Sequence, residues 1–307
     1  MSELLQIQRK RLPEWFKIKM PSDKYSEVKN IVKGNSLHTI CEEARCPNLS
    51  ECWSHGTATF LILGDTCTRW CSYCNVKTGM PKFTDLSEPL KVADAVSKLN
   101  LKYVVITSVT RDDLSDGGAL IYSNTISEIR KSAPECSIEI LIPDFKIIKV
   151  GEGGVLRDGY LNIDALKVVV DSKPDVLSHN IETARRIFKK VRTGGNYDVS
   201  LNLLRKVKSL NPSMPTKSGV MVGLGESLEE LYGTFQDLIS AGVEFLSIGQ
   251  YLQPSSIHAP IEKFYTPAEF DILKQKAISF GFIHVEAGPL VRSSYRADKL
   301  NSHINKS

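Results

Sequence analysis

Short apolar runs alternate with longer amphipathic segments along most of the chain, from about residue 59 to residue 280. Short runs rich in Val, Ile or Leu and free of internal proline are typical of buried strands, whereas apolar residues recurring every three or four positions are typical of helices. The apolar runs predict strands at residues 59–63, 103–108, 138–142, 175–179, 218–222 and 245–250.

The amphipathic segments predict helices at residues 90–99, 119–131, 162–171, 182–190, 199–210, 228–241 and 267–280. Asn180, Ser227 and Thr266 stand where helix N-caps are expected. Right-handed crossovers between parallel strands would curl these units into a barrel or an incomplete barrel, with the loops that follow each strand gathered at one rim. An open doubly wound sheet is the alternative, and periodicity alone does not separate the two.

The chain divides into three parts by pattern, with no tandem repeat and no linker. Residues 1–58 contain several prolines and predict an irregular N-terminal extension, residues 59–283 carry the strand and helix alternation, and residues 284–307 form a C-terminal segment. This last segment is expected to add one strand and then a loop that ends near Arg296.

The composition of the chain excludes several classes of protein. The chain has 307 residues, of which 42% are hydrophobic and 24% charged, and a formal net charge of +4, which excludes disorder, collagen and coiled coil. Apolar runs are far shorter than the roughly 20 residues that span a bilayer, and residues 1–12 carry Glu3 and no apolar core. We expect a cytoplasmic protein without membrane or nucleic-acid partners. The basic run Arg9, Lys10 and Arg11 is expected to be a solvent-exposed edge.

The cysteines are concentrated in one region. Of the 7 in the chain, all but Cys136 lie between Cys41 and Cys74. A reducing compartment does not use such a group for disulfides, so the concentration indicates metal ligation. Cys136 stands alone and is expected to be an ordinary core or surface thiol.

Cys67, Cys71 and Cys74 follow the first predicted strand directly. Three thiolates on one tight loop can bind three irons of a four-iron cluster, which leaves the fourth iron open to another molecule. Tyr73 would place its ring beside that iron or pack beneath the cluster. The alternative is a zinc site, which needs a fourth ligand such as His55.

Cys41, Cys46 and Cys52 form a second triplet, again with three thiols and not four. By itself this spacing is compatible with zinc or with inert thiols. Beside the first triplet, it indicates a second cluster with one ligand that is not a cysteine.

These motifs resemble the radical S-adenosylmethionine enzymes, and within them the lipoyl synthase family. The resemblance runs from about residue 13 to residue 298 and rests on these blocks: Cys41-Glu-Glu-Ala-Arg-Cys46-Pro-Asn-Leu-Ser-Glu-Cys52-Trp, Gly64-Asp-Thr-Cys67-Thr-Arg-Trp-Cys71-Ser-Tyr-Cys74, Thr107-Ser-Val-Thr-Arg-Asp-Asp, His179-Asn-Ile-Glu-Thr183, Thr216-Lys-Ser-Gly219, Gly249-Gln-Tyr-Leu-Gln-Pro254 and Arg292-Ser-Ser-Tyr295.

The resemblance implies a fold, an activity and cofactors. The fold is the incomplete parallel (βα)6 barrel of that superfamily, and the activity is insertion of two sulfur atoms, at carbons 6 and 8, into an octanoyl chain on a lysine of a carrier domain. It implies that one [4Fe–4S] cluster, on Cys67, Cys71 and Cys74, cleaves S-adenosylmethionine to a 5′-deoxyadenosyl radical. The other, on the Cys41 triplet with Ser294 as its fourth ligand, is consumed as the sulfur source.

Further residues are expected to contact S-adenosylmethionine. Asn180 and Glu182 would address the ribose hydroxyls and the amino group, although both could instead belong to the start of a helix. Arg192 would pair with the methionine carboxylate or be a surface arginine. Ser108 and Gln250 end predicted strands and belong to the same rim.

Some segments of the sequence are not expected to contact a cofactor. Residues 223–227 lack the third glycine of a dinucleotide fingerprint and predict a turn into a helix. Lys217 falls in a block shared with the family, but no role follows from its position. Residues 146–163 form a longer loop than the family pattern leads us to expect, which concerns substrate or partner docking.

The implied partners are an octanoylated lipoyl carrier domain (of a 2-oxoacid dehydrogenase E2 or a glycine cleavage H protein), a ferredoxin or flavodoxin type electron donor, and an iron–sulfur assembly protein. Two other functions remain open at this point. One is a related sulfur-inserting enzyme of the biotin synthase or methylthiolating kind. The other is a cluster carrier or electron-transfer module, which would need no large substrate cavity.

Overall fold

Strands of the computed structural model follow one another in chain order across one parallel sheet. The structure describes residues 11–17, 20–21, 23–55, 58–150 and 156–304. The parallel strands are β2 (Thr59–Ile62), β5 (Tyr103–Ser108), β6 (Ser137–Leu141), β9 (Val176–Ser178), β10 (Thr216–Val222), β11 (Phe245–Gln250) and β12 (His284–Gly288). At one edge, the short β1 (His38–Thr39) pairs antiparallel with β2.

This strand order decides between the two predicted architectures. A doubly wound sheet reverses its strand order at a switch point, whereas here each parallel strand pairs with the next along the chain. The open-sheet alternative is therefore wrong, and the incomplete barrel is confirmed. The six predicted strands are all present, and the strand expected after residue 284 joins the sheet as β12.

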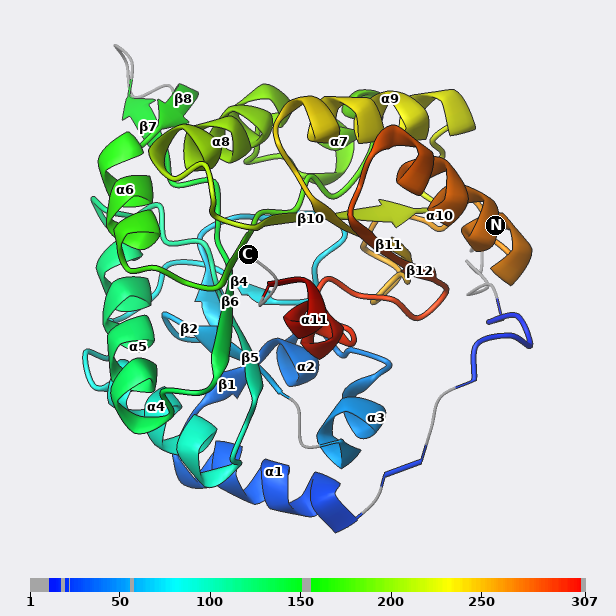
Figure 1. Ribbon diagram of the computed structural model, residues 1–307. Coiled ribbons are helices and arrows are strands. Elements are labelled where there is room, and N and C mark those ends of the chain that lie inside the picture. Colours follow the sequence, from blue (N-terminus) through cyan, green and yellow to red (C-terminus); the bar gives the residue numbers. More distant parts are fainter. Residues whose placement is uncertain (1–10, 18–19, 22, 56–57, 151–155, 305–307) are drawn as a thin grey trace, which may run out of the picture.

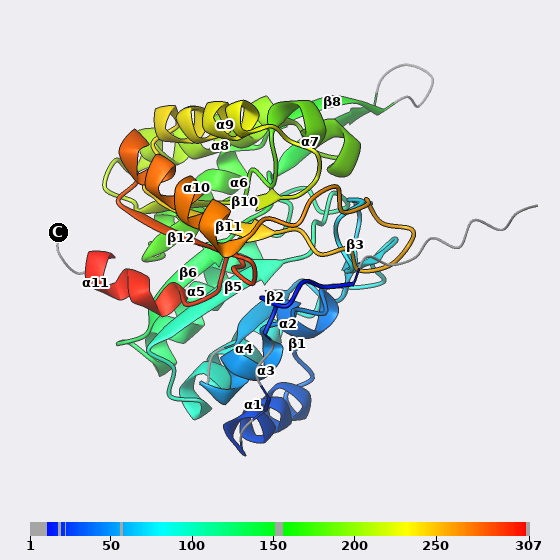
Figure 2. The same cartoon turned by 90° about the vertical axis from the view of Figure 1, so that its right-hand side faces the viewer.

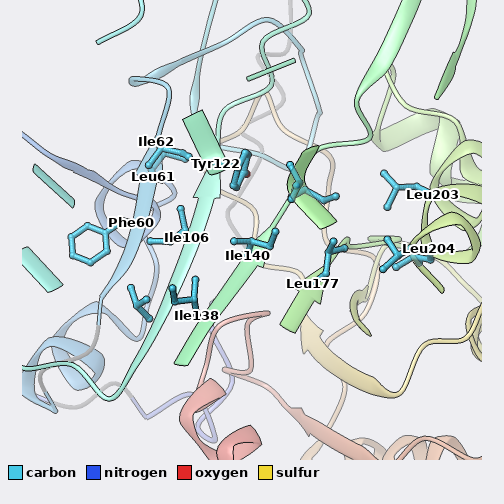
Figure 3. Close-up of a cluster of buried hydrophobic side chains, with 14 of the residues drawn as sticks. Phe60, Leu61, Ile62, Ile106, Tyr122, Ile138, Ile140, Leu177, Leu203 and Leu204 are labelled. Carbon is cyan, nitrogen blue, oxygen red and sulfur yellow. The ribbon is translucent and has the colours of Figure 1, made fainter. Parts of the chain in front are cut away.

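Seven helices form an arc around the outside of the sheet (Figure 1). They are α4 (Glu88–Lys98), α5 (Ala119–Ser132), α6 (Ile163–Asp171), α7 (Arg185–Val191), α8 (Tyr197–Leu210), α9 (Leu228–Ser240) and α10 (Pro267–Phe280). Apolar side chains fill the layer between strands and helices, and Figure 3 shows Ile106, Ile138 and Ile140 of adjacent strands within it.

Two of the predicted caps are confirmed and one is wrong. Ser227 and Thr266 each form a capping box at the start of α9 and α10. Asn180 caps no helix, because α7 begins only at Arg185, after Ala184. Its side chain is thereby left for another role.

The N-terminal extension is not irregular, which corrects the prediction. It contains α1 (Asp23–Gly34), α2 (Ile40–Glu43) and α3 (Leu49–Ser54). Val28 and Val32, four positions apart on α1, are fully buried, and Tyr25 packs its ring against Trp53 of α3 at 5.2 Å. The missed signal was this single apolar stripe, which the surrounding prolines obscured.

The segment predicted as a long loop contains a hairpin. β7 (Lys146–Val150) pairs antiparallel with β8 (Leu156–Leu161), and residues 151–155 between them lie outside the described residues, as do Arg9 and Lys10. In Figure 2 the hairpin extends toward the same side of the molecule as β3 (Thr66–Cys67). None of the described helices is long and apolar enough to cross a membrane.

The C-terminal segment closes the end of the barrel at which the parallel strands begin. After β12 the chain forms η2 (Ala297–Leu300) and α11 (Asn301–Ile304), which Figure 2 shows on the side of the molecule opposite β3. Ala297 and Leu300 pack against Tyr103, Val105 and Phe245 at the barrel floor.

A polar group crosses the barrel interior just above this floor. Lys217 Nζ lies 3.0 Å from both carboxylate oxygens of Glu139, which also accepts hydrogen bonds from Tyr103 Oη and Ser178 Oγ, each at 2.7 Å. Glu139 and Ser178 are fully buried, and Lys217 is 4% exposed. Lys217, for which the sequence offered no role, therefore compensates a buried carboxylate by ion pairing.

Replacing Lys217 by Met is expected to lower the free energy of unfolding by about 3–5 kcal/mol, because Glu139 is left buried without a counter-charge. Urea unfolding of the cofactor-free protein measures the change. Lys102→Met, at an exposed lysine just before β5, should change it by less than about 0.5 kcal/mol. A Lys217 variant as stable as the Lys102 control would contradict the role of the ion pair.

Candidate active site

A cavity of about 910 Å³ opens where the parallel strands end, and it is lined by the residues that were expected to bind the clusters or S-adenosylmethionine. Loops after parallel strands gather at one rim of such a fold, so segments distant in sequence meet there. The predicted residues that line it are Cys41, Cys46, Cys52, Cys67, Cys71, Tyr73, Cys74, Ser108, Asn180, Glu182, Arg192, Gln250 and Ser294.

The first cysteine triplet lies on a loop that leaves β2 through a sharp turn. Leu63 and Gly64 both have positive φ, 69° and 87°, and the short parallel pair β3 and β4 (Lys77–Thr78) closes the loop. Burial raises the pKa of Cys74 to about 12, and the charges of Cys71 and Cys67 raise it further.

Arg69, within the same loop, fixes the loop to the barrel. Its Nε and Nη2 donate to the two carboxylate oxygens of Asp112 at 2.8 and 2.7 Å, and its Nη1 donates to Asp144 at 2.7 Å. Arg69 is 6% exposed and Asp144 is fully buried. Neighbouring Thr110 donates its backbone N–H to Cys67 Sγ at 3.4 Å. Sequence reasoning missed this ion-paired group because its members come from three separate segments.

Cys41 lies on α2, Cys46 in the connection that follows it, and Cys52 on α3. Burial raises the pKa of the Cys41 thiol to about 12. Cys46 donates its backbone N–H to Cys41 O at 2.9 Å, which holds the two residues together. The half-buried Arg292 guanidinium acts on Cys46: burial raises the pKa of this thiol, and the positive charge of Arg292 lowers it. Arg292 was part of a sequence motif, but its place beside these thiols was not predicted.

Ser294 reaches the cavity because the C-terminal segment is tied to α3. Asn48 donates to Leu290 O at 2.5 Å, and Tyr295 Oη donates to Glu51 at 3.4 Å. These contacts bracket Ser294, which lines the same cavity as the second triplet.

Four of the predicted residues form one connected group on a wall of the cavity: Tyr73, Asn180, Glu182 and Arg192. Arg192 Nη1 donates to Asn180 O at 2.9 Å, and both Glu182 and Tyr73 act on the Arg192 charge. Glu182 is held at a φ of 71°, a conformation that costs energy in a residue other than glycine and is typical of functional sites. A Cβ added at Gly219 would lie 2.7 Å from Asn180 Oδ1, so a larger side chain there would displace the amide.

Three residues that line this cavity have a buried polar atom without a hydrogen-bond partner among the described residues: Asn48, Ser108 and Asn180. Ser108 Oγ and Asn180 Oδ1 make no hydrogen bond there, and such atoms are rare in native proteins unless a ligand or water satisfies them. The wall therefore fits a polar ligand such as S-adenosylmethionine. Gln250 differs, because its Nε2 already donates to Val222 O, Tyr251 O and Lys263 O and its Oε1 accepts from Tyr265 N.

The other candidate ligands have ordinary surroundings. His55 is exposed, and its Nδ1 lies 2.7 Å from Glu51 O. Cys136 is buried in the core behind β6, in agreement with the prediction. Among the described residues, no three His, Cys, Asp or Glu side chains are arranged to bind a single metal ion.

Fold and site together define a radical S-adenosylmethionine enzyme. A family model described as the radical SAM superfamily matches residues 61–238. The fold is similar to that of the hydrogenase maturase HydG from Carboxydothermus hydrogenoformans (TM-score 0.52, 13% identity, 92% of this chain and 78% of that one). It is also similar to methylornithine synthase PylB (TM-score 0.50, 12% identity, 94% of each chain).

Within that superfamily, the chain belongs to the lipoyl synthase family. Residues 2–46 match a model of the N-terminal domain of lipoyl synthase. The chain is 53% identical over 290 residues to a lipoyl synthase of Symbiobacterium thermophilum, covering 94% of this chain and 86% of that protein. It is 50% identical over 296 residues to one of Bacillus cereus, covering 96% and 95%.

Family membership confirms the predicted enzyme class, lipoyl synthase function and cofactors, which are S-adenosylmethionine and [4Fe–4S] clusters. The two alternative functions, a different sulfur-inserting enzyme and an electron carrier, are thereby set aside. The assignment of individual residues to each cofactor is a separate question.

If the first triplet binds a cluster, as predicted, replacing Arg69 by Lys should weaken retention of its iron. A lysine cannot reproduce the forked contact with Asp112, and each lost hydrogen bond to a charged group is worth about 1.5–3 kcal/mol, or about tenfold in an equilibrium. Iron and sulfide per chain after exposure to a chelator measure retention. Arg186→Lys is the matched control, because Arg186 makes an exposed forked contact with Glu230. Equal retention in both variants would contradict the role of Arg69.

Proposed function

We propose that this cavity is the site of lipoyl formation, with one cluster on each cysteine triplet. The observation that carries the proposal is that both triplets line one continuous cavity. A radical formed at one side and a sulfur source at the other must act on the same chain, and a shared cavity allows this without release of an intermediate.

When bound, one cluster with S-adenosylmethionine supplies a radical able to remove hydrogen from unactivated C–H bonds, and the second cluster supplies sulfur. Cys67, Cys71 and Cys74 would hold the first cluster. Asn180 and Ser108 offer unpaired polar atoms to the ligand. The remaining charged groups of this wall are one cation, Arg192, and one carboxylate, Glu182, which match the opposite charges of an amino acid.

Cys41, Cys46, Cys52 and Ser294 would hold the second cluster. A serine oxygen is a hard ligand on an iron otherwise bound by soft sulfur, so it should leave more readily than a thiolate. Arg292 places a positive charge beside Cys46 and offsets the negative charge of the thiolates. Residues 38–55 and 290–295, which are tied together by the contacts of Asn48 and Tyr295, would then hold this cluster together.

The substrate is an octanoyl chain on a lysine of a lipoyl carrier domain, in which sulfur enters at carbons 6 and 8. Apolar side chains inside the cavity suit a saturated chain: Leu61, Val105, Leu141, Ile142 and Val220 line it. The carrier would be a 2-oxoacid dehydrogenase E2 domain or a glycine cleavage H protein. A ferredoxin or flavodoxin type donor and an iron–sulfur assembly protein complete the expected partners.

Replacing Cys71 by Ala should abolish formation of 5′-deoxyadenosine, whereas Cys46→Ala should retain cleavage of S-adenosylmethionine and lose the lipoyl product. The reason is that each thiol belongs to a different cluster. Mass spectrometry of an octanoyl-lysine peptide incubated anaerobically with S-adenosylmethionine and dithionite measures both products. Cys136→Ala, at a thiol outside the cavity, is the matched control. Sulfur insertion by the Cys46 variant would contradict the donor assignment.

Replacing Ser294 by Ala should reduce lipoyl product by about tenfold or more, the scale of losing one positioned group, while cleavage of S-adenosylmethionine continues. The Mössbauer spectrum of the second cluster should change because its oxygen ligand is gone. Ser293→Ala provides the control, since this neighbouring hydroxyl lines the same cavity. An unchanged spectrum and product yield in the Ser294 variant would remove Ser294 from the ligand set.

A further inference from the structure

The loop that carries the first triplet has two sides. Cys67, Arg69, Cys71 and Tyr73 line the cavity, whereas Thr68, Trp70 and Ser72, which alternate with them, are absent from the described cavity wall. Trp70 is 67% exposed. An indole left in water at the centre of a ligand-binding loop calls for an explanation, because large exposed apolar groups mark interaction sites when they cluster.

Two neighbouring segments pack against this outer side of the loop. Ser72 donates its backbone N–H to Val191 O at 2.8 Å and its Oγ to Lys190 O at 3.4 Å, which brings the end of α7 alongside. Ala259 donates its N–H to Ser72 O at 2.8 Å, and this ties the segment after β11 to the loop. Figure 2 shows that segment, in orange, beside β3.

Exposed apolar and cationic side chains stand on these three adjoining segments. We call Trp70, Ile257, Lys189 and Lys190 the outer cluster face. Ile257 is 89% exposed, and both lysines are exposed and make no ion pair with the described part of the chain. Small apolar centres with charged rims are typical of weak electron-transfer encounters.

We propose that the outer cluster face is the docking surface for an acidic protein that carries single electrons. The inference rests on the proposed function, in which the cluster on Cys67, Cys71 and Cys74 must be reduced before each cleavage. Electrons cannot enter through the cavity, because S-adenosylmethionine and substrate occupy it during the reaction. On the outer side, Trp70 stands next to Cys71 in the sequence, so a carrier that docks there would contact the cysteine loop itself.

The positive charge of the outer cluster face indicates which class of protein would bind there. Lys189 and Lys190 attract a negatively charged surface and accelerate its encounter. The lipoyl carrier domain fits this face poorly, because it must present its modified lysine at the cavity, and none of the four residues lines the cavity.

The step itself is a one-electron transfer. The reduced carrier loses one electron and is oxidised, the cluster gains that electron, and no proton or group passes between the two proteins. The face therefore needs only to hold the carrier briefly and close to the loop.

The test compares the double variant Lys189→Glu/Lys190→Glu with the reconstituted wild-type enzyme, using a bacterial flavodoxin as the probe. We expect the Kd for flavodoxin, measured by isothermal titration calorimetry, to rise about tenfold or more and to lose most of its dependence on salt. Formation of 5′-deoxyadenosine should fall similarly with flavodoxin and flavodoxin reductase, yet stay unchanged with dithionite, which needs no docking surface.

Lys102→Glu/Arg205→Glu is the matched control, because it makes the same change in net charge at exposed positions on other surfaces. An unchanged Kd in the Lys189/Lys190 variant, or an equal loss in the control, would overturn the docking surface. So would weakened binding of an octanoylated carrier domain with flavodoxin binding intact. Failure of the wild-type enzyme to cleave S-adenosylmethionine with dithionite would instead contradict the proposed function, which keeps the two failures distinct.

Discussion

The contact of Arg69 with Asp112 and Asp144 is the interaction on which the site depends. It joins the cysteine loop, the loop after β5 and the segment after β6, and it is buried, so it loses little to solvent screening. A loop with three cysteines and little regular hydrogen-bond ladder has few other means of holding a fixed shape. Because the loop is fixed, its two sides can differ: thiols and Tyr73 face the cavity, and Trp70 faces water.

The barrel interior is arranged in layers that follow from the same geometry. The cavity opens at the carboxyl ends of the strands and extends to Tyr103 and Ala297, beside the pair Glu139–Lys217, and Leu300 closes the floor with Phe245. A polar group at this depth is stable only because its hydrogen bonds are satisfied within the protein.

Much of this could be predicted from the sequence, and the omissions have a physical cause. Strands in parallel sheets are short apolar runs, so all six were found, and cysteine spacing marks a cluster loop because the ligands are local. Contacts between segments leave no such local trace. The pairing of Arg69 with Asp144 spans 75 positions and that of Lys217 with Glu139 spans 78. Asn180 was assigned a cap because its type fits one, and only the start of α7 at Arg185 shows otherwise.

Ser294, proposed above as the fourth ligand of the second cluster, lies on a segment that is held before and after it. Asn48 binds Leu290 O before Ser294, and after it Tyr295 contacts Glu51 of α3 while Ala297 and Leu300 pack in the barrel floor. These anchors are contacts within the protein, so the hydroxyl would be positioned before any cluster binds and would stay near if a bond to iron broke. A hard oxygen ligand that leaves readily and a main chain that does not move away would be complementary properties of a cluster that has to give up its sulfur.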